Sequence, residues 1–453
     1  MEYGIICLLP VVVVISVALY TKRTFEALLS GAITAFIITS GFNGFFNRTI
    51  DAFYNVLCDA DVVWVLLICA LFGSLIKLFD KSNATYGIAN FILKYAKTEK
   101  KSQLISWLLG IVIFVDDYLN VMTVGNTMRP VTDKLKSPRE MLAYVIDCTA
   151  GPVCILIPFS TWVAFYIGLF QSDPQIAALG EGMSTYYRVI PFTFYNIITV
   201  ILVPLFVLGI IPHFGPMKKA YERVNAGGKV YAENSEYLNK NDYETNIKLE
   251  GNLFDFIIPI SVLIVLTIAV EDILIGVIGA IIACAAIYFP RRKMSFREFS
   301  ESIAEGIGYM IPLLLLVFGA FLFKEALTDV DLANYIISKV QPYMIKALFP
   351  ALTFVVVAFL AFVVGSAWGI PAVSLPLIMP LCFAVGANPY LTLGAILSAG
   401  GFGCHACFYA DVTVMASQVC KIDVLDHALT QIPYALIAAF SSALLYLVFG
   451  IIL

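Results

Sequence analysis

Long apolar runs recur along this chain at a length that suits the hydrocarbon core of a membrane. A helix needs about 20 predominantly apolar residues to cross a bilayer. The chain is also 60% hydrophobic and only 13% charged, against about 25% charged in soluble domains. Its net charge of −4 argues against nucleic acid as a partner. The sequence therefore predicts an all-α polytopic membrane protein with about ten spanning helices, near residues 4–20, 25–41, 60–79, 138–169, 188–212, 253–270, 272–290, 301–323, 389–417 and 430–452.

Two further apolar stretches, about 103–133 and 343–387, are interrupted in the middle by polar or small residues. The first is too short to cross the bilayer twice. Non-helical backbone at membrane depth has to be buried in protein or face a water-filled cavity. We therefore expect both stretches to form re-entrant hairpins.

Lysine and arginine in short loops predict the orientation of the chain, because cytoplasmic loops carry an excess of them. Lys22 and Arg23 follow the first span, whereas the loop 171–187 has neither residue type. The polar segment 213–252 and the sequence Arg291-Arg292-Lys293 read as internal. The pattern predicts a multi-pass protein of the cell membrane with both termini outside.

The two halves of the chain are related. Residues 88–92 (IANFI) recur as residues 332–336 (LANYI), and each copy precedes an interrupted hairpin and then a broken helix. Five crossings per half make the second copy inverted, and inverted repeats with matched breaks at the midplane are typical of secondary transporters. The alternative is that glycine and proline merely kink these helices. We expect a first repeat at 1–212 with its broken helix at about 138–169, a cytoplasmic linker at 213–252, and a second repeat at 253–453 with its broken helix at about 389–417.

Four acidic residues lie at expected membrane depth, where a charged side chain costs about 2.5–3.5 kcal/mol. Asp116 and Asp117 lie at the first hairpin tip, Asp147 in the first broken helix and Asp411 in the second. Carboxylates suit small hard cations such as Na⁺, and the same groups take up protons when desolvated. The alternatives are helix capping at the hairpin tip, a buried pair with a basic partner for Asp147, and simple solvation of Asp411.

Other signals are weaker. The spacing of Cys404 and Cys407 around His405 would fit a metal or redox site. Small residues at a close contact between helices explain this spacing better. His213 and His427 flank predicted spans and read as interfacial residues. No phosphate-binding loop appears, so we expect neither an enzyme nor an ATP-driven pump, and no cofactor beyond the transported ions.

At these residues the chain resembles the NhaC family of sodium/proton antiporters, within the larger ion transporter superfamily. Three blocks carry the resemblance: FVDDYLN at 114–120 running on to VGNTMRPVTD at 124–133, then LAYVIDCTAGPV at 142–153 with Ser160-Thr161-Trp162, and GSAWG at 365–369. The resemblance implies an ion or substrate site at Asp116, Asp117, Asn120, Asn126, Thr127, Asp147, Ser160, Thr161, Ser366, Trp368, His405, Asp411 and Thr413. It also implies a homodimer.

One block departs from the family pattern. The second broken helix of the family typically reads Gly-Asp-His-Cys-Ser-Pro-x-Ser-Asp-Thr-Thr, whereas residues 403–413 here read GCHACFYADVT. Cys404 replaces an acidic residue, and Phe408 and Tyr409 introduce aromatic rings that would suit an organic side chain.

Two functions follow, and sequence alone separates them poorly. The first is exchange of Na⁺ for H⁺ by alternating access, with Na⁺ held at Asp116, Asp117, Asp147 and Asp411. The second is Na⁺- or H⁺-coupled transport of an amino acid or small organic acid, whose carboxylate would lie at helix N-termini. A membrane scaffold or receptor would leave the buried acids unexplained. We favour antiport because the acid-rich hairpin is intact.

Overall fold

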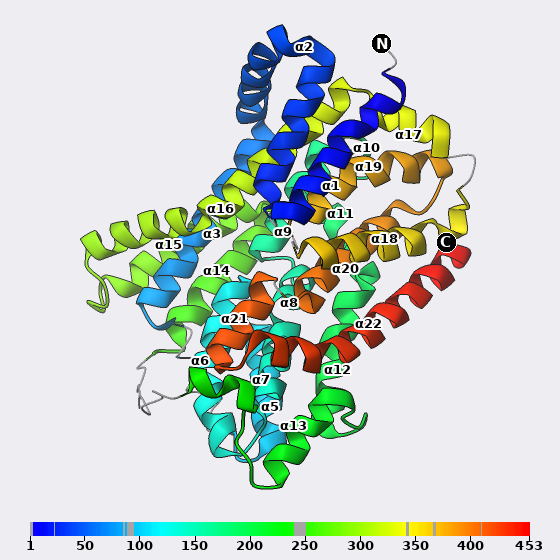
Figure 1. The fold of residues 1–453 in the computed structure, drawn as a ribbon. Helices are drawn as coiled ribbons and strands as arrows, with labels where there is room; N and C mark the ends of the chain where they lie inside the picture. The colour runs from blue at the N-terminus through cyan, green and yellow to red at the C-terminus, as the bar shows by residue number, and fades with distance from the viewer. Residues whose placement is uncertain are drawn as a thin grey trace.

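The structure, a computed structural model, describes residues 3–21, 23–84, 87, 95–239, 251–340, 344–365, 368–408 and 410–453. Helices make up the fold, and the described residues include no β-strand (Figure 1). Seven of the described helical segments are long and apolar enough to cross a membrane, or eight if a pair bent by 54° at Thr193 counts as one span. The predicted all-α polytopic fold is confirmed. Three of the ten predicted spans, at 4–20, 253–270 and 272–290, correspond to shorter apolar helices.

One group of helices packs around the long helix α16 (Phe296–Asp329), which contacts both α3 and α2. Gly73 and Gly306 lie where α3 crosses α16, and a Cβ atom on either would collide with the backbone of the other. Glycine therefore permits this close crossing. The other members of the group are η1 (Gly4–Leu8), α1 (Leu9–Thr21), α2 (Thr24–Cys58), α3 (Ala60–Lys81), α14 (Phe254–Val270) and α15 (Ile273–Tyr288).

Helix α2 is kinked at Gly41, whose φ of 67° and ψ of 173° are accessible in practice to glycine alone. The kink turns the second part of α2 back over α16 (Figure 1). There Arg48 forms a two-pronged hydrogen bond with Asp329 (2.7 and 3.0 Å) and a salt bridge to Glu325 (2.8 Å). The single predicted span at 25–41 is thus only the first part of a longer bent helix.

A second group of helices contains both hairpins and both broken helices. The first hairpin is interrupted at residues 113–116, between α5 and α6. In the second predicted hairpin, helix ends at Val364 and begins again at Gly369, and the first arm, Lys346–Val364, is itself long and apolar enough to cross a membrane. The group comprises α5 (Glu99–Val112), α6 (Asp117–Lys134), α7 (Arg139–Thr149), α8 (Gly151–Leu156), α9 (Thr161–Ser172), α12 (Phe194–Leu208), α18 (Phe349–Val364), α19 (Gly369–Val385), α20 (Pro389–Ala406), α21 (Asp411–Cys420) and α22 (Val424–Ile452).

Short helices connect these elements: α10 (Pro174–Ala177), α11 (Gly182–Val189), η2 (Ile190–Phe192), α17 (Leu332–Val340) and η5 (Lys346–Leu348). α17 begins with residues 332–336, the second copy of the repeated pentapeptide. The first copy, at 88–92, lies outside the described residues. The inverted relation between the halves therefore stays a prediction.

The predicted linker is folded in the part that the structure describes. Residues 213–239 contain α13 (Gly215–Asn225) and η3 (Glu233–Leu238). Arg223 forms a salt bridge with Glu140 at the start of α7 (2.9 Å), and Asn239 accepts a hydrogen bond from Arg139 (2.6 Å). The segment thus packs against the base of the first broken helix.

Candidate functional site

The first hairpin tip places two carboxylates at the start of α6. Asp116 is the N-cap residue, with extended backbone, and its Oδ1 accepts a hydrogen bond from the backbone N–H of Leu119 (3.1 Å). Asp117 begins the helix. Both side chains are almost completely buried. The predicted helix capping is therefore confirmed for Asp116. Asp117 Oδ1 accepts a hydrogen bond from the backbone N–H of Tyr118 (3.1 Å).

Asn120 holds the break open, one helical turn into α6. Its side-chain amide nitrogen lies 2.6, 3.0 and 2.9 Å from the carbonyl oxygens of Gly110, Ile113 and Thr149. Carbonyls at the end of a helix lack hydrogen-bond donors within the helix, and the Asn120 amide group donates to these carbonyls. Its amide oxygen has no hydrogen-bond partner among the described residues. The contacts made by Asn120 are to the backbone of the hairpin and the broken helix.

The first broken helix is interrupted twice and forms a hydrogen bond with the hairpin tip. Ala150 leaves helical geometry between α7 and α8, and residues 157–160 separate α8 from α9. Ser160 caps α9 through the N–H of Val163 (3.2 Å). Next to it, Thr161 donates from its hydroxyl to Asp116 Oδ2 (3.3 Å). Two predicted site residues thus position the tip.

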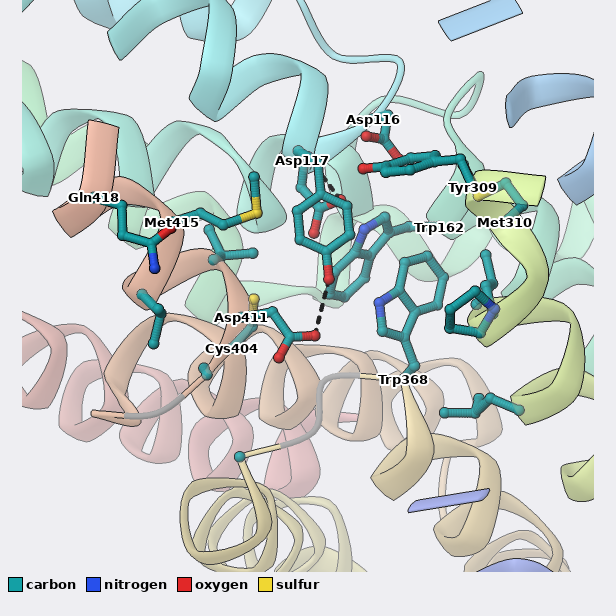
Figure 2. A pocket seen from close by; sticks show the side chains of 18 residues that line it. Asp116, Asp117, Trp162, Tyr309, Met310, Trp368, Cys404, Asp411, Met415 and Gln418 are labelled. Carbon is teal, nitrogen blue, oxygen red and sulfur yellow. Dashed lines mark hydrogen bonds between the residues drawn. The ribbon is translucent and has the colours of Figure 1, made fainter. Parts of the chain in front are cut away.

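The second broken helix brings a third carboxylate to the same place. α20 ends at Ala406 and α21 begins at Asp411. The phenol of Tyr118 donates a hydrogen bond to Asp411 Oδ2 (2.9 Å), and Figure 2 shows this bond next to Asp117. Asp411 is solvent-accessible, but it is not simply solvated, because Tyr118 holds it in place.

These elements surround a cavity of about 720 Å³ between α16 and the second group of helices. Asp116, Asp117 and Asp411 all line it (Figure 2). The rings of Trp162 and Trp368 pack with their centroids 4.3 Å apart on one wall. No described lining residue is basic; the others are Tyr118, Tyr309, Met310, Pro312, Leu313, Leu316, Gly365, Cys404, Ala410, Val412, Val414, Met415 and Gln418.

The fourth predicted acid, Asp147, does not line this cavity. It is fully buried, and its Oδ2 accepts hydrogen bonds from Thr413 (3.0 Å) and Gln431 (2.8 Å) and lies 3.1 Å from His427 Nε2. Its Oδ1 has no hydrogen-bond partner among the described residues. Thr413 also donates to the carbonyl of Cys404 (3.2 Å), so one hydroxyl connects Asp147 to the cavity wall.

His427 is a correction to the sequence reading. It was predicted at the membrane interface, yet it is completely buried because α22 packs its first turns against α7 and α21. The alternative prediction for Asp147 was a buried pair with a basic partner, and His427 is that partner. The signal in the sequence was the spacing of His427 and Gln431, four residues apart on one face of an apolar helix.

His405 belongs to a neighbouring buried network. Its Nδ1 lies 2.6 Å from the hydroxyl of Tyr195 and its Nε2 lies 3.1 Å from the sulfur of Cys148. The carbonyl of His405 accepts a hydrogen bond from Gln431, which links this network to Asp147.

The remaining predicted residues are scattered. Trp368 lines the cavity, whereas Asn126 is exposed on α6, and Thr127 is half-buried with a hydroxyl lacking a partner among the described residues. Phe408 packs edge-on against Phe362 and does not line the cavity. Ser366 and Tyr409 lie outside the described residues.

Sequence reasoning missed the contribution of α16. Tyr309, Met310 and Leu313 form one side of the cavity, and they lie in an uninterrupted apolar run that resembles any other span. Tyr118 was visible inside the acidic motif, but only the fold shows its link to Asp411.

Comparison with known proteins gives three kinds of match. A family model described as the Na⁺/H⁺ antiporter family matches residues 153–451. An uncharacterized protein of Haemophilus influenzae is 26% identical over 98% of this chain and 90% of its own length. The malate-2H⁺/Na⁺-lactate antiporter of Bacillus subtilis is 24% identical over 35% of this chain and 34% of its own length.

Two solved structures share the fold. Neisseria gonorrhoeae MtrF, described with a class of antimetabolite efflux pumps, superposes with a TM-score of 0.64 at 14% identity, over 90% of this chain and 84% of its own. The YdaH transporter of Alcanivorax borkumensis gives 0.60 at 13% identity, over 90% and 88%. At these identities the likeness concerns the fold.

Proposed function

The chain belongs to the Na⁺/H⁺ antiporter family, and from this premise we propose that it exchanges Na⁺ for H⁺ by alternating access. It is a transporter of the secondary type and not an enzyme. One observation carries the proposal: Asp116, Asp117 and Asp411, from opposite halves of the sequence, line one cavity whose described lining has no basic side chain.

Exchange follows from competition for these carboxylates. Their oxygens are hard ligands that suit Na⁺, and each carboxylate also accepts a proton. Two adjacent buried carboxylates repel one another when both are charged, so Asp116 and Asp117 need a cation or a proton between them. Since either occupant relieves the repulsion and both cannot occupy the same oxygen, the site alternates between them.

Asp147 is proposed as a second ion or proton position. Among the described residues, Asp147 Oδ1 is the only buried carboxylate oxygen without a hydrogen-bond partner. The hydroxyl of Thr413 contacts both the Asp147 carboxylate and the carbonyl of Cys404, a residue of the cavity wall. Binding of an ion or a proton at Asp147 would therefore change the contacts of Thr413 at the α20–α21 break.

The test uses purified protein in liposomes with a pH-sensitive dye trapped inside. Addition of external Na⁺ should raise the internal pH in the wild type, with Li⁺ and K⁺ measured alongside. Asp117→Asn should abolish the response, and Asp51→Asn, an exposed position on α2, should keep it. Tight liposomes that show no proton movement with any of the three cations would exclude this function.

A second candidate is coupled transport of an amino acid or small organic acid. The observation that favours it is size, because a cavity of about 720 Å³ is in the range of sites for small organic ligands, about 300–1,000 Å³. The Bacillus relative named for malate and lactate points the same way over part of the chain. Uptake of labelled amino acids and of lactate under a Na⁺ gradient separates this candidate from ion exchange.

We further propose residence in the cell membrane as a homodimer with both termini outside, among lipids. The lysine and arginine distribution supports this orientation. Accessibility of a terminal tag to added protease in intact cells tests the orientation, and native mass measurement in detergent tests the dimer.

A further inference from the structure

We propose that the cavity binds and transports an organic ammonium ion that carries a hydrogen-bond acceptor, such as an amino alcohol. This inference rests on the proposed transport function, because it names a substrate class for the same cavity. It differs from the organic-acid candidate in the sign of the charge that the cavity accepts.

Charge is the first argument. Three carboxylates line the cavity, and its described lining includes no Lys, Arg or His. The lining has no basic partner for a free carboxylate group on a solute, and three acids would repel it, whereas an ammonium group would be paired. A low-dielectric site strengthens both effects. The sequence positions next to the described lining, Ser366, Ala367 and Tyr409, are also not basic.

The aromatic walls are the second argument. Trp162 and Trp368 pack together, Tyr118 and Tyr309 meet edge to face with their centroids 6.2 Å apart, and all four residues line the cavity. Aromatic faces attract ammonium groups through their quadrupole, and clusters of such rings recognise quaternary ammonium ions. A bare Na⁺ requires oxygen ligands and gains little from such walls.

A hydrophobic surface is available for the carbon skeleton of such a molecule. Met310, Leu313 and Leu316 from α16 and Met415 from α21 all line the cavity. An inorganic ion has no use for this surface, whereas burying the carbon atoms of an organic cation on it is favourable.

An unpaired donor is the third, independent argument. Trp162 is completely buried, and its indole N–H makes no hydrogen bond of good geometry with the described residues, although the Asp117 carboxylate lies near it. Figure 2 shows the ring between Asp117 and Trp368, on the cavity wall. Buried polar atoms normally have partners, so a substrate atom that accepts from this N–H would complete the site. This donor is the reason for specifying an acceptor on the ammonium compound.

Choline is a suitable probe, because it combines a permanent ammonium charge with a hydroxyl and cannot cross the bilayer as a free base. Its neutral carbon isostere, 3,3-dimethylbutan-1-ol, is the matched control ligand. Trp162 and Trp368 are two of the four tryptophans of the chain, so saturable change in tryptophan fluorescence reports binding directly. Choline should bind at least about tenfold more tightly than the isostere, which is the scale of a desolvated cation–π contact.

Matched variants locate the site. Asp411→Asn and Asp117→Asn should each weaken choline binding about tenfold or more. Asp51→Asn on the surface of α2 should leave it unchanged. Trp107→Phe should keep the fluorescence change, because Trp107 donates to the carbonyl of Val200 (2.9 Å) away from the cavity.

Transport is measured separately in liposomes with the internal pH dye, where a choline gradient should drive proton exit from the lumen. Choline binding without any Na⁺-driven proton movement would retain this inference and exclude sodium exchange. Sodium exchange in a protein that binds choline no better than its isostere would overturn the inference and keep the proposed function. Preferential binding of lactate over choline would also overturn it.

Discussion

Tyr118 and Asp411 lie 293 positions apart in the chain, yet the phenol of one donates a 2.9 Å hydrogen bond to the carboxylate of the other. The bond joins the first turn of α6 to the first turn of α21, so it connects the hairpin of one half to the broken helix of the other. It also occupies one oxygen of a carboxylate that we propose as a cation ligand.

Replacing Tyr118 with phenylalanine should therefore free that oxygen. A single hydrogen bond contributes about 1 kcal/mol net, so the half-saturating Na⁺ concentration in the liposome assay should fall about fivefold. Tyr20→Phe, at a fully exposed tyrosine, serves as the control. An unchanged Na⁺ requirement in Tyr118→Phe would show that the bond does not compete with the ion, and a higher requirement would show that the bond assists the site.

His427→Leu should destabilise the protein, because it removes one of three partners of the buried Asp147 carboxylate. Losing a partner of a buried charge costs about 3–5 kcal/mol, which should lower the unfolding temperature in detergent by several degrees. His427→Gln, which keeps a donor, should lower it less. The double variant His427→Leu/Asp147→Leu should lose less stability than His427→Leu alone, since no unpaired acid remains. Equal losses in all three variants would contradict this account.

Gly306→Ala should separate α3 from α16, because the added methyl group would collide with the backbone of Gly73. Overpacking of this kind costs about 1–3 kcal/mol. Gly308 lies two residues further along the same helix with nothing near its missing Cβ, so Gly308→Ala is the matched control. Thermal unfolding monitored by size-exclusion chromatography should show a loss for the first variant and no loss for the second. The crossing would be looser than described if both variants unfold at the wild-type temperature.

We expect His213, which lies outside the membrane spans, to make the stability of the protein depend on pH. Its ring stacks on Tyr221 with centroids 4.2 Å apart, and burial, aided by Lys100, lowers its pKa despite the opposing charge of Glu99. A lowered pKa means that His213 contributes stability above about pH 6.5, its unfolded value, and that this contribution is lost as the pH falls. His213→Phe keeps the stack and should lose less thermal stability between pH 7.5 and 5.5 than the wild type. A parallel loss in both proteins would exclude His213 as the cause.

Much of the fold could be predicted from the sequence, because span length and loop charge are local properties. The break at 113–116 lies at the acidic tip of the first hairpin, and the break at Ala150 lies next to Gly151 and Pro152. The kink at Gly41 was not predicted. Gly41 lies between Ser40 and Phe42, and this local sequence gives no sign that its φ is positive or that the helix continues past it.

The candidate site was harder to predict than the fold. Asp116, Asp117 and Asp411 were selected because acids at membrane depth are costly, and all three line one cavity. Asp147 was grouped with them because it has the same chemistry, although helix packing places it in a separate network with His427 and Gln431. Which face of α22 turns inward depends on packing between distant segments, and one sequence does not contain that information.

The absence of a basic residue from the described cavity lining has a consequence for membrane voltage. An empty cavity with three ionised acids would carry a charge of −3, and each elementary charge that crosses the membrane field is worth about 2.3 kcal/mol per 100 mV. Return of the empty site is therefore feasible only when protons neutralise most of these acids. The dependence of turnover on membrane potential would then count the protons that travel with the empty carrier, and so reveal whether the exchange is electrogenic.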